Sequence, residues 1–304
     1  MEALTRPLRV ALAASLVGLN TIVHCSVLFV VALLKFLLGF GPMGRAWSRL
    51  LVLLAESWIS CNNVVFAMAS RTRWEVQGLE GLSYERSYLV LANHQSWVDI
   101  PVLQKVFNRR IPFLRFFLKS QLIWVPLLGL AWWALDFPFM KRYSRERLER
   151  SPELRGTDIA ATRKACAKFR DMPVSVMNFV EGTRFTDRKH ARGGGGYTHL
   201  LRPKSGGVAF VLDAMGDALH AMLDVTIRYP LGRPTLVDLL AGRVRRIQVH
   251  VQERSIPPEM LGGDYENDPE YRARFQGWIN GLWAEKDARL EALCQADKGA
   301  DVAR

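Results

Sequence analysis

The sequence contains little cysteine, and its cysteines are arranged for neither disulfides nor metal binding. Only four occur in 304 residues, and they lie far apart, at positions 25, 61, 166 and 294. None belongs to a CxxC motif or pairs with a histidine at metal-ligand spacing. A disulfide scaffold is therefore excluded, and we expect four ordinary buried thiols in a reducing compartment.

Acidic residues are scarce relative to basic ones. The chain has 29 Asp and Glu against 41 Lys and Arg, which gives a net charge of +12 and a pI near 9.9. This excess predicts an anionic partner: nucleic acid, a lipid surface or a phosphorylated substrate. Disorder is excluded, because 49% of the residues are apolar and their burial can offset the ordering entropy.

Several familiar signatures are missing from the chain. There is no internal repeat, no GxSxG nucleophile elbow and no compact array of basic and aromatic residues. The glycine run at 193–196 lacks the GKS/T ending of a nucleotide-binding loop and reads as a flexible loop. These absences argue against a serine hydrolase, a P-loop enzyme and a nucleic-acid-binding protein.

The N-terminal part has a long hydrophobic run. Residues 10–34 are 25 positions without Lys, Arg, Asp or Glu, and at about 1.5 Å per residue such a helix crosses a hydrocarbon core. A secretory signal is the competing interpretation, because Arg6 and Arg9 precede the run. The run is longer than a usual signal and no cleavage site follows promptly, so a membrane anchor is favoured.

A second apolar stretch covers residues 50–69 but contains Glu56, Asn62 and Asn63. It suits a helix packed on the first or lying in the interface better than an independent span. Residues 1–73 are thus predicted to form a membrane-anchoring helical pair. Basic residues flank both stretches, so the outer ends and the connection favour the cytoplasmic face, in a re-entrant hairpin or a double crossing.

Residues 74–304 have the pattern of an α/β domain. Uninterrupted apolar runs at 88–92 and 174–180 are typical of strands buried on both faces. Further strands are expected at 74–76, 223–228 and 247–251, with helices near 158–170 and 269–293. This alternation predicts an α/β fold with a mostly parallel sheet and surrounding helices. Segment 121–138, with three Trp and no Lys or Arg, is either buried core or an interfacial surface.

Polar residues follow the two most buried runs, where ligands of open α/β sheets bind. His94 and Asp99 come after the first run, and Glu181, Gly182, Thr183 and Arg184 come after the second. At this spacing the carboxylate can meet one imidazole nitrogen while the other faces substrate, which would make a general-base dyad. The structural alternatives are a core histidine, a helix-capping Asp99 and an Arg184–Glu181 salt bridge.

These motifs resemble those of a known family. Asn93-His94-Gln95-Ser96 with Asp99 looks like the HX4D block of the glycerolipid acyltransferases, the lysophosphatidic acid acyltransferase superfamily, and FVEGTR at 179–184 is similar to its phosphate-binding FPEGTR block. A lysine-containing segment at 117–129, a block at 139–142 and VTIRYP at 225–230 match in order. The segments NHQSWVD at 93–99, ALDFPFMKRYSRER at 134–147 and NFVEGTRF at 178–185 look most like the lysocardiolipin-acyltransferase-like branch, which includes a bacterial inner-membrane enzyme.

The resemblance implies catalysis by His94 and Asp99. These residues would activate the free hydroxyl, at sn-2, of a lysophospholipid, with lysophosphatidic acid as the first candidate and lysophosphatidylglycerol or lysocardiolipin as others. A hydrolase or thioesterase using the same dyad is the alternative. Ser96 is then a helix cap rather than a nucleophile. The residues expected to bind or shape the phosphate site are Lys119, Arg142, Glu181, Gly182, Thr183 and Arg184.

The same resemblance implies the partners. Acyl-CoA or acyl carrier protein would supply the acyl group, both anionic and suited to a basic surface. No metal or organic cofactor is expected, and no nucleic acid. The enzyme would sit in the inner membrane of the cell, with its catalytic domain, residues 74–304, on the cytoplasmic side.

Overall fold

The computed structural model describes residues 2–140, 172–193 and 196–302. The predicted helix at 158–170 lies outside them. The helices and strands of the described residues are α1 (Glu2–Leu38), α2 (Gly41–Ala69), β1 (Arg73–Gln77), β2 (Tyr88–Ala92), α3 (Asp99–Phe107), β3 (Leu114–Phe116), β4 (Leu118–Lys119), η1 (Ser120–Trp124), α4 (Leu128–Ala134), β5 (Phe139–Met140), β6 (Ser175–Phe179), α7 (Asp187–Arg192), α8 (Gly206–Met215), η3 (Gly216–Ala218), β7 (Ala221–Arg228), α9 (Leu236–Leu240), β8 (Arg246–Arg254), η4 (Pro258–Met260) and α10 (Pro269–Val302).

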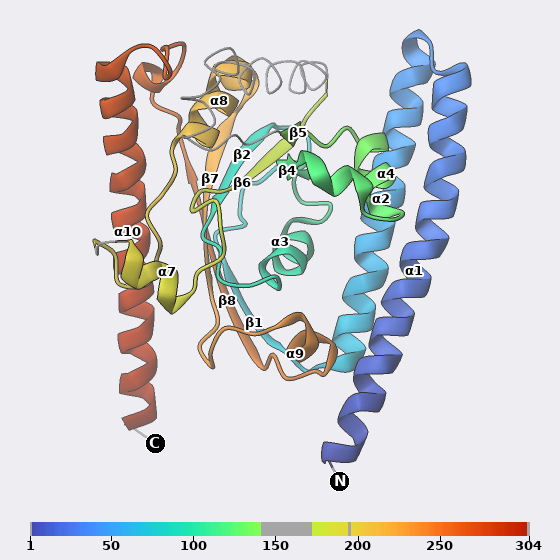
Figure 1. Ribbon diagram of the computed structural model, residues 1–304, viewed down its shortest axis with the longest axis horizontal. Coiled ribbons are helices and arrows are strands. Elements are labelled where there is room, and N and C mark those ends of the chain that lie inside the picture. Colours follow the sequence, from blue (N-terminus) through green and yellow to red (C-terminus); the bar gives the residue numbers. More distant parts are fainter. Residues whose placement is uncertain (1, 141–171, 194–195, 303–304) are drawn as a thin grey trace.

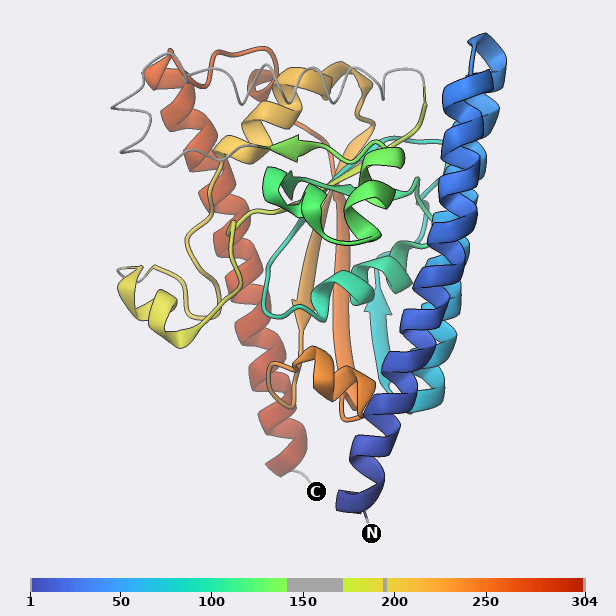
Figure 2. The same cartoon turned by 45° about the vertical axis from the view of Figure 1, so that its right-hand side comes forward.

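The two N-terminal helices form an antiparallel pair along one side of the molecule (Figures 1 and 2). By length and composition, Arg6–Leu38 and Gly41–Ala69 are both able to cross a membrane. The polar residues within α2 face protein: Asn62 accepts a hydrogen bond from Asn20 of α1 at 2.8 Å, and Glu56 accepts one from Tyr84 at 2.6 Å. The predicted helical pair is therefore confirmed, with α2 packed on α1.

The described strands build one main sheet in the order β1-β8-β7-β2-β6-β3. All neighbouring pairs are parallel except β7 and β8, which are antiparallel. The predicted α/β fold with a mostly parallel sheet is confirmed. Strand β3 was not predicted, because it has only three residues and includes Arg115; β4 and β5 form a separate two-stranded sheet.

Both faces of the sheet are covered by apolar side chains. In β2, Leu89 and Leu91 join a core shared with α8 and α10, while Tyr88, Val90 and Ala92 join a second core with α3. Figure 1 shows α10 on one side of the sheet and α3 with the helical pair on the other. Burial on both faces explains why β2 is apolar at every position rather than alternating.

Segment 121–138 combines the two environments proposed for it. Ala131, Leu135 and Phe137 are buried in a third core with residues of α1 and α2. Trp124 and Trp133, in contrast, are 85% and 58% exposed. One side of the segment thus packs on the helical pair, and the other presents large aromatic side chains at the surface.

The expectation of uniformly buried cysteines was wrong. Cys25 is buried between the helices, but Cys61 is exposed and Cys294 is half-buried; Cys166 lies outside the described residues. Cys61 is exposed because α2 carries it on the side turned away from the protein core, which apolar composition alone does not specify. The division into residues 1–73 and 74–304 stays a prediction.

Candidate active site

The polar turns after β2 and β6 lie side by side at one end of the sheet. The two strands are parallel neighbours with Ala92 opposite Phe179, so the residues that follow them meet. The backbone N–H of His94 donates to Glu181 Oε1 at 3.1 Å, and the N–H of Phe185 donates to the His94 carbonyl at 2.7 Å. The turn that contains His94 and the turn that contains Glu181 therefore lie next to each other, as expected from the sequence.

His94 and Asp99 form a direct pair. His94 Nδ1 lies 2.8 Å from Asp99 Oδ2, and the Asp99 carboxylate is fully buried. Because an ionised carboxylate only accepts hydrogen bonds, Nδ1 is the nitrogen that directs a proton at Asp99, and in a neutral ring Nε2 is then an acceptor. The Phe179 ring stacks on the imidazole with 3.8 Å between centroids, which restrains the ring plane.

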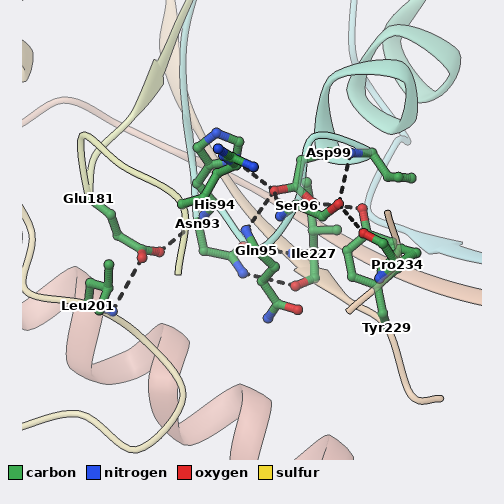
Figure 3. Close-up of polar contacts among 12 residues, drawn as sticks. Asn93, His94, Gln95, Ser96, Asp99, Glu181, Leu201, Ile227, Tyr229 and Pro234 are labelled. Carbon is green, nitrogen blue, oxygen red and sulfur yellow. Dashed lines mark hydrogen bonds and ion pairs between the residues drawn. The ribbon is translucent and has the colours of Figure 1, made fainter. Parts of the chain in front are cut away.

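Asp99 is held by donors on every side (Figure 3). The backbone N–H groups of Gln95 and Ser96 donate to Oδ2 at 2.6 and 2.8 Å. The hydroxyl of Tyr229 donates to Oδ1 at 2.6 Å. Asp99 opens α3 but accepts from the preceding turn rather than capping its own helix, so its carboxylate orients the histidine.

Sequence reasoning missed Tyr229 as a member of this cluster. It follows β7, 130 positions after Asp99, and its side chain is buried. Burial first, and then the negative charge of Asp99, raises the pKa of Tyr229 well above its usual value, so the phenol stays a donor. The only sequence signal was its place in the VTIRYP block, which identified the segment but not the contact.

Ser96 has a structural position. Its Oγ accepts from the Val98 N–H at 3.0 Å and donates to the Pro234 carbonyl. The α3 helix begins at Asp99 with no side-chain cap, so the predicted cap is replaced by a bond within the turn before the helix. This anchors the turn to the segment that follows β7.

Glu181 ties the two turns together. Its carboxylate is 1% exposed and accepts from the N–H groups of His94 and Leu201, the latter at 3.3 Å. Burial raises the pKa of Glu181 to about 8, although the two amide hydrogen bonds oppose that shift. Its carboxylate binds backbone, and the alternative of an Arg184 salt bridge is not what the site contains.

Arg184 instead lies over the Trp97 ring, with its Cζ 4.4 Å from the ring centroid. The neighbouring Thr183 Oγ1 accepts from the Lys189 ammonium at 2.6 Å. Gly182 has φ +68°, which favours glycine, and a Cβ there would lie 3.1 Å from Lys204 Cδ. The turn therefore gathers three cationic side chains around a tight glycine bend.

The remaining predicted phosphate ligands are placed differently. Lys119 is exposed in β4, which belongs to the small second sheet. Arg142 lies outside the described residues. Among the predicted site residues, the structure thus brings together His94, Asp99 and Glu181 by direct contacts, with Gly182, Thr183 and Arg184 in the adjoining turn.

Within the described parts of the chain, no three His, Cys, Asp or Glu side chains gather closely enough to hold a metal ion. The chemistry that the cluster offers is proton transfer by an oriented imidazole beside an arginine suited to an anionic group.

These residues lie in a segment that matches the model of a known protein family. The family model described as Acyltransferase matches residues 73–229, which include the His94 turn, the Glu181 turn and Tyr229. This match covers just over half of the chain.

Two relatives illustrate the similarity. The chain is 28% identical over 184 residues to 1-acyl-sn-glycerol-3-phosphate acyltransferase delta of Mus musculus, which covers 57% of this chain and 43% of that protein. It is 28% identical over 254 residues to lysocardiolipin acyltransferase 1 of Danio rerio, covering 78% of this chain and 60% of the relative. The matches thus span about half the length of these relatives.

A solved structure has the same fold. The 1-acyl-sn-glycerophosphate (LPA) acyltransferase PlsC from Thermotoga maritima superposes with a TM-score of 0.54 over 93% of this chain and 98% of its own. At 16% sequence identity this likeness concerns the fold alone.

Proposed function

Because the chain belongs to the glycerolipid acyltransferase superfamily, we propose that it transfers a fatty acyl group to the free hydroxyl, at sn-2, of a lysophospholipid. Lysophosphatidic acid is the first candidate acceptor, since relatives are named for acylglycerol phosphate. Lysocardiolipin is the second, on the name of another relative. Acyl-CoA or acyl carrier protein serves as the donor.

The observation that carries this proposal is the His94–Asp99 pair. A lipid hydroxyl is a poor nucleophile at neutral pH and needs a base to take its proton during attack. His94 Nδ1 lies 2.8 Å from the buried Asp99 carboxylate, so in the neutral imidazole the proton sits on Nδ1 and Nε2 is left as the acceptor for the hydroxyl proton. Tyr229 and two backbone amides fix Asp99 in turn, so the imidazole is oriented before substrate arrives.

The proposed reaction balances with these groups alone. The acceptor oxygen attacks the thioester carbonyl carbon as its proton moves to His94 Nε2. The C–S bond then breaks, the ester remains, and the imidazolium returns its proton to the leaving thiolate. Asp99 stabilises the transient imidazolium and keeps its own charge. No covalent enzyme intermediate is required, and we propose that no metal or organic cofactor takes part.

The turn after β6 is proposed to bind the acceptor phosphate. The guanidinium of Arg184 presents a planar fork of donors that matches phosphate oxygens, and its stacking on Trp97 limits its freedom. Gly182 and Thr183 shape the bend beside it, and Glu181 joins this bend to His94. Lys119 and Arg142 are proposed as further ligands of the same phosphate.

The membrane position is also proposed. Two long apolar helices and a lipid acceptor favour a membrane protein. Basic residues at the ends of these helices favour the cytoplasmic face of the inner membrane for the catalytic domain.

The test uses the full chain in detergent with oleoyl-CoA and a panel of lysophosphatidic acid, lysophosphatidylglycerol and lysocardiolipin. Free thiol and acylated lipid are followed together. We expect thiol release that depends on an acceptor, is abolished by His94→Ala and is unchanged by a chelator. His220→Ala, which alters an exposed histidine bonded to Arg86, is the matched control and keeps activity.

Thiol release of equal rate without acceptor would replace the transferase with a thioesterase or hydrolase. Full activity in His94→Ala would refute the general-base role.

A further inference from the structure

A groove opens between the two N-terminal helices at the end where the chain begins. It has about 430 Å³ of space. Near it, the N-terminal end of α1, the C-terminal end of α2 and helix α9 converge (Figures 1 and 2). Its lining includes Arg9, Leu12, Leu16, Val65, Met68 and Arg71.

The walls of this groove are apolar and partly uncovered. Leu12 and Met68 are 60% and 75% exposed, and Leu16 and Val65 are half-buried beside them. Leu12 and Leu16 are four positions apart on α1 and therefore share one helix face. An apolar surface of this kind between two helices suits an acyl chain.

The charges of the groove lie at one end. Arg9 lies near the start of α1 and Arg71 is the second residue after the end of α2, so both residues lie where the helical pair ends. Both are exposed, and among the described residues no carboxylate lines the groove. In the described part of the chain, no acidic side chain that lines the groove is therefore available to neutralise these two arginines.

This arrangement has the polarity of a phospholipid. Arg9 and Leu16 are seven positions apart, and a helix rises roughly 10 Å over that length. A phosphate at Arg9 and Arg71 would thus leave the first part of an acyl chain alongside Leu12, Leu16, Val65 and Met68. Gly242 closes the floor by packing on Ala69, where a Cβ would lie 1.9 Å from the Ala69 carbonyl oxygen.

We propose that this groove binds one anionic phospholipid, its phosphate on Arg9 and Arg71 and one acyl chain between α1 and α2. Clustered arginines at the end of membrane helices favour anionic headgroups. The site is separate from the His94 turn and does not depend on the proposed reaction.

The test is native mass spectrometry of the delipidated full chain carrying His94→Ala, titrated with dioleoyl phosphatidylglycerol or dioleoyl phosphatidylcholine. The two lipids share their acyl chains, so a difference reports the headgroup. We expect one phosphatidylglycerol to bind at least roughly tenfold more tightly than phosphatidylcholine. Arg9→Gln with Arg71→Gln should remove this preference.

Two controls define the site. Arg274→Gln with Lys298→Gln makes the same change of charge at exposed positions of α10 and should keep the preference. Leu16→Trp fills the apolar part while both arginines remain, and it should weaken binding of both lipids.

Equal affinity for the two lipids, or an unchanged preference in the double arginine variant, would overturn the proposal. Loss of phosphatidylglycerol binding in Arg184→Gln, with the groove variants unaffected, would assign the lipid to the acceptor site instead.

Discussion

Asp99 and Asp224 are two buried carboxylates of one domain with opposite surroundings. Asp99 is bound by an imidazole, a phenol and two backbone amides. Asp224, in β7, is bound by the fully buried ammonium of Lys286 and lies 3.5 Å from the guanidinium groups of Arg254 and Arg289.

The difference separates a reactive carboxylate from a structural one. The ammonium of Lys286 and the guanidinium groups of Arg254 and Arg289 compensate the charge of Asp224, which is thereby committed to holding α10 on the sheet. The hydrogen-bond donors of Asp99 fix its position without cancelling its charge, which remains available to an imidazolium that forms during catalysis. Both carboxylates are buried, so the chemical nature of their hydrogen-bond and ion-pair partners is what distinguishes them.

Neutralising Asp99 is the most direct test of the difference between the two carboxylates. Asp99→Asn keeps the size of the side chain but removes the charge and one acceptor. We expect kcat for acceptor-dependent acyl transfer to fall by roughly 10³ to 10⁴-fold, as when a carboxylate that orients a catalytic histidine is neutralised. Steady-state thiol release measures this, and Asp224→Asn, compared per folded molecule, should lose far less. Similar losses in both variants would contradict the distinction.

Asp224 should instead govern stability. Asp224→Ala leaves Lys286 buried without its carboxylate, and we expect the free energy of unfolding to fall by about 3–5 kcal/mol. Pulse proteolysis in urea on the detergent-solubilised chain measures the change. The double variant Asp224→Leu with Lys286→Met removes both charges and should recover most of the loss; failure to recover would show that packing, not charge pairing, sets the cost.

The same ion cluster predicts a pH dependence. Burial alone would raise the pKa of Asp224, but Lys286, with Arg289 and Arg254, outweighs burial and lowers it. A carboxyl whose folded pKa is lowered stabilises the fold above its unfolded pKa, about 3.9, and this contribution disappears as the pH falls through the folded value. The stability difference between wild type and Asp224→Asn should therefore shrink as the pH falls below about 4. A difference that stayed the same from about pH 5 to about pH 2 would exclude the Asp224 carboxylate as its source.

Tyr229 tests the role of the neutral hydrogen-bond donors around Asp99, because its hydroxyl donates to the Asp99 carboxylate. Tyr229→Phe removes one hydrogen bond to a charged group, worth about 1.5–3 kcal/mol. We expect kcat to fall roughly 10- to 100-fold with KM for both substrates unchanged, since Tyr229 positions Asp99 without contacting substrate. A matched Tyr84→Phe, which removes the hydroxyl bonded to Glu56, should leave kcat intact. An effect on KM alone would move Tyr229 into substrate binding.

Sequence patterns predicted the elements whose signal lies within a short stretch of the chain. The apolar runs gave β2 and β6, and therefore the meeting of their turns, because parallel neighbours end at the same edge. They did not predict that β8 runs antiparallel to β7, since its alternating burial fits either direction. Helix α8 begins at two glycines and gives a weak signal.

Contacts between site residues could be predicted only where both residues belong to the same motif. The spacing of His94 and Asp99 is local, so their contact followed from the sequence. Tyr229 and Leu201 reach the site from 130 and 20 positions away, and Lys286 meets Asp224 across 62 positions. Such contacts depend on how the whole sheet is assembled, which no local pattern encodes.

The smallest expected effect concerns Trp97, which supports Arg184 as Tyr229 supports Asp99, but at the surface. Trp97 is 50% exposed, and a cation–π contact at an exposed site contributes about 0.5–1 kcal/mol. Trp97→Leu should therefore raise KM for lysophosphatidic acid roughly 2- to 5-fold and leave kcat unchanged, because the ring orients the guanidinium without contributing charge. Arg184→Gln, which removes the charge itself, should raise KM further. If Trp97→Leu lowered kcat and left KM unchanged, the stacked ring would belong to the His94 turn rather than to phosphate binding.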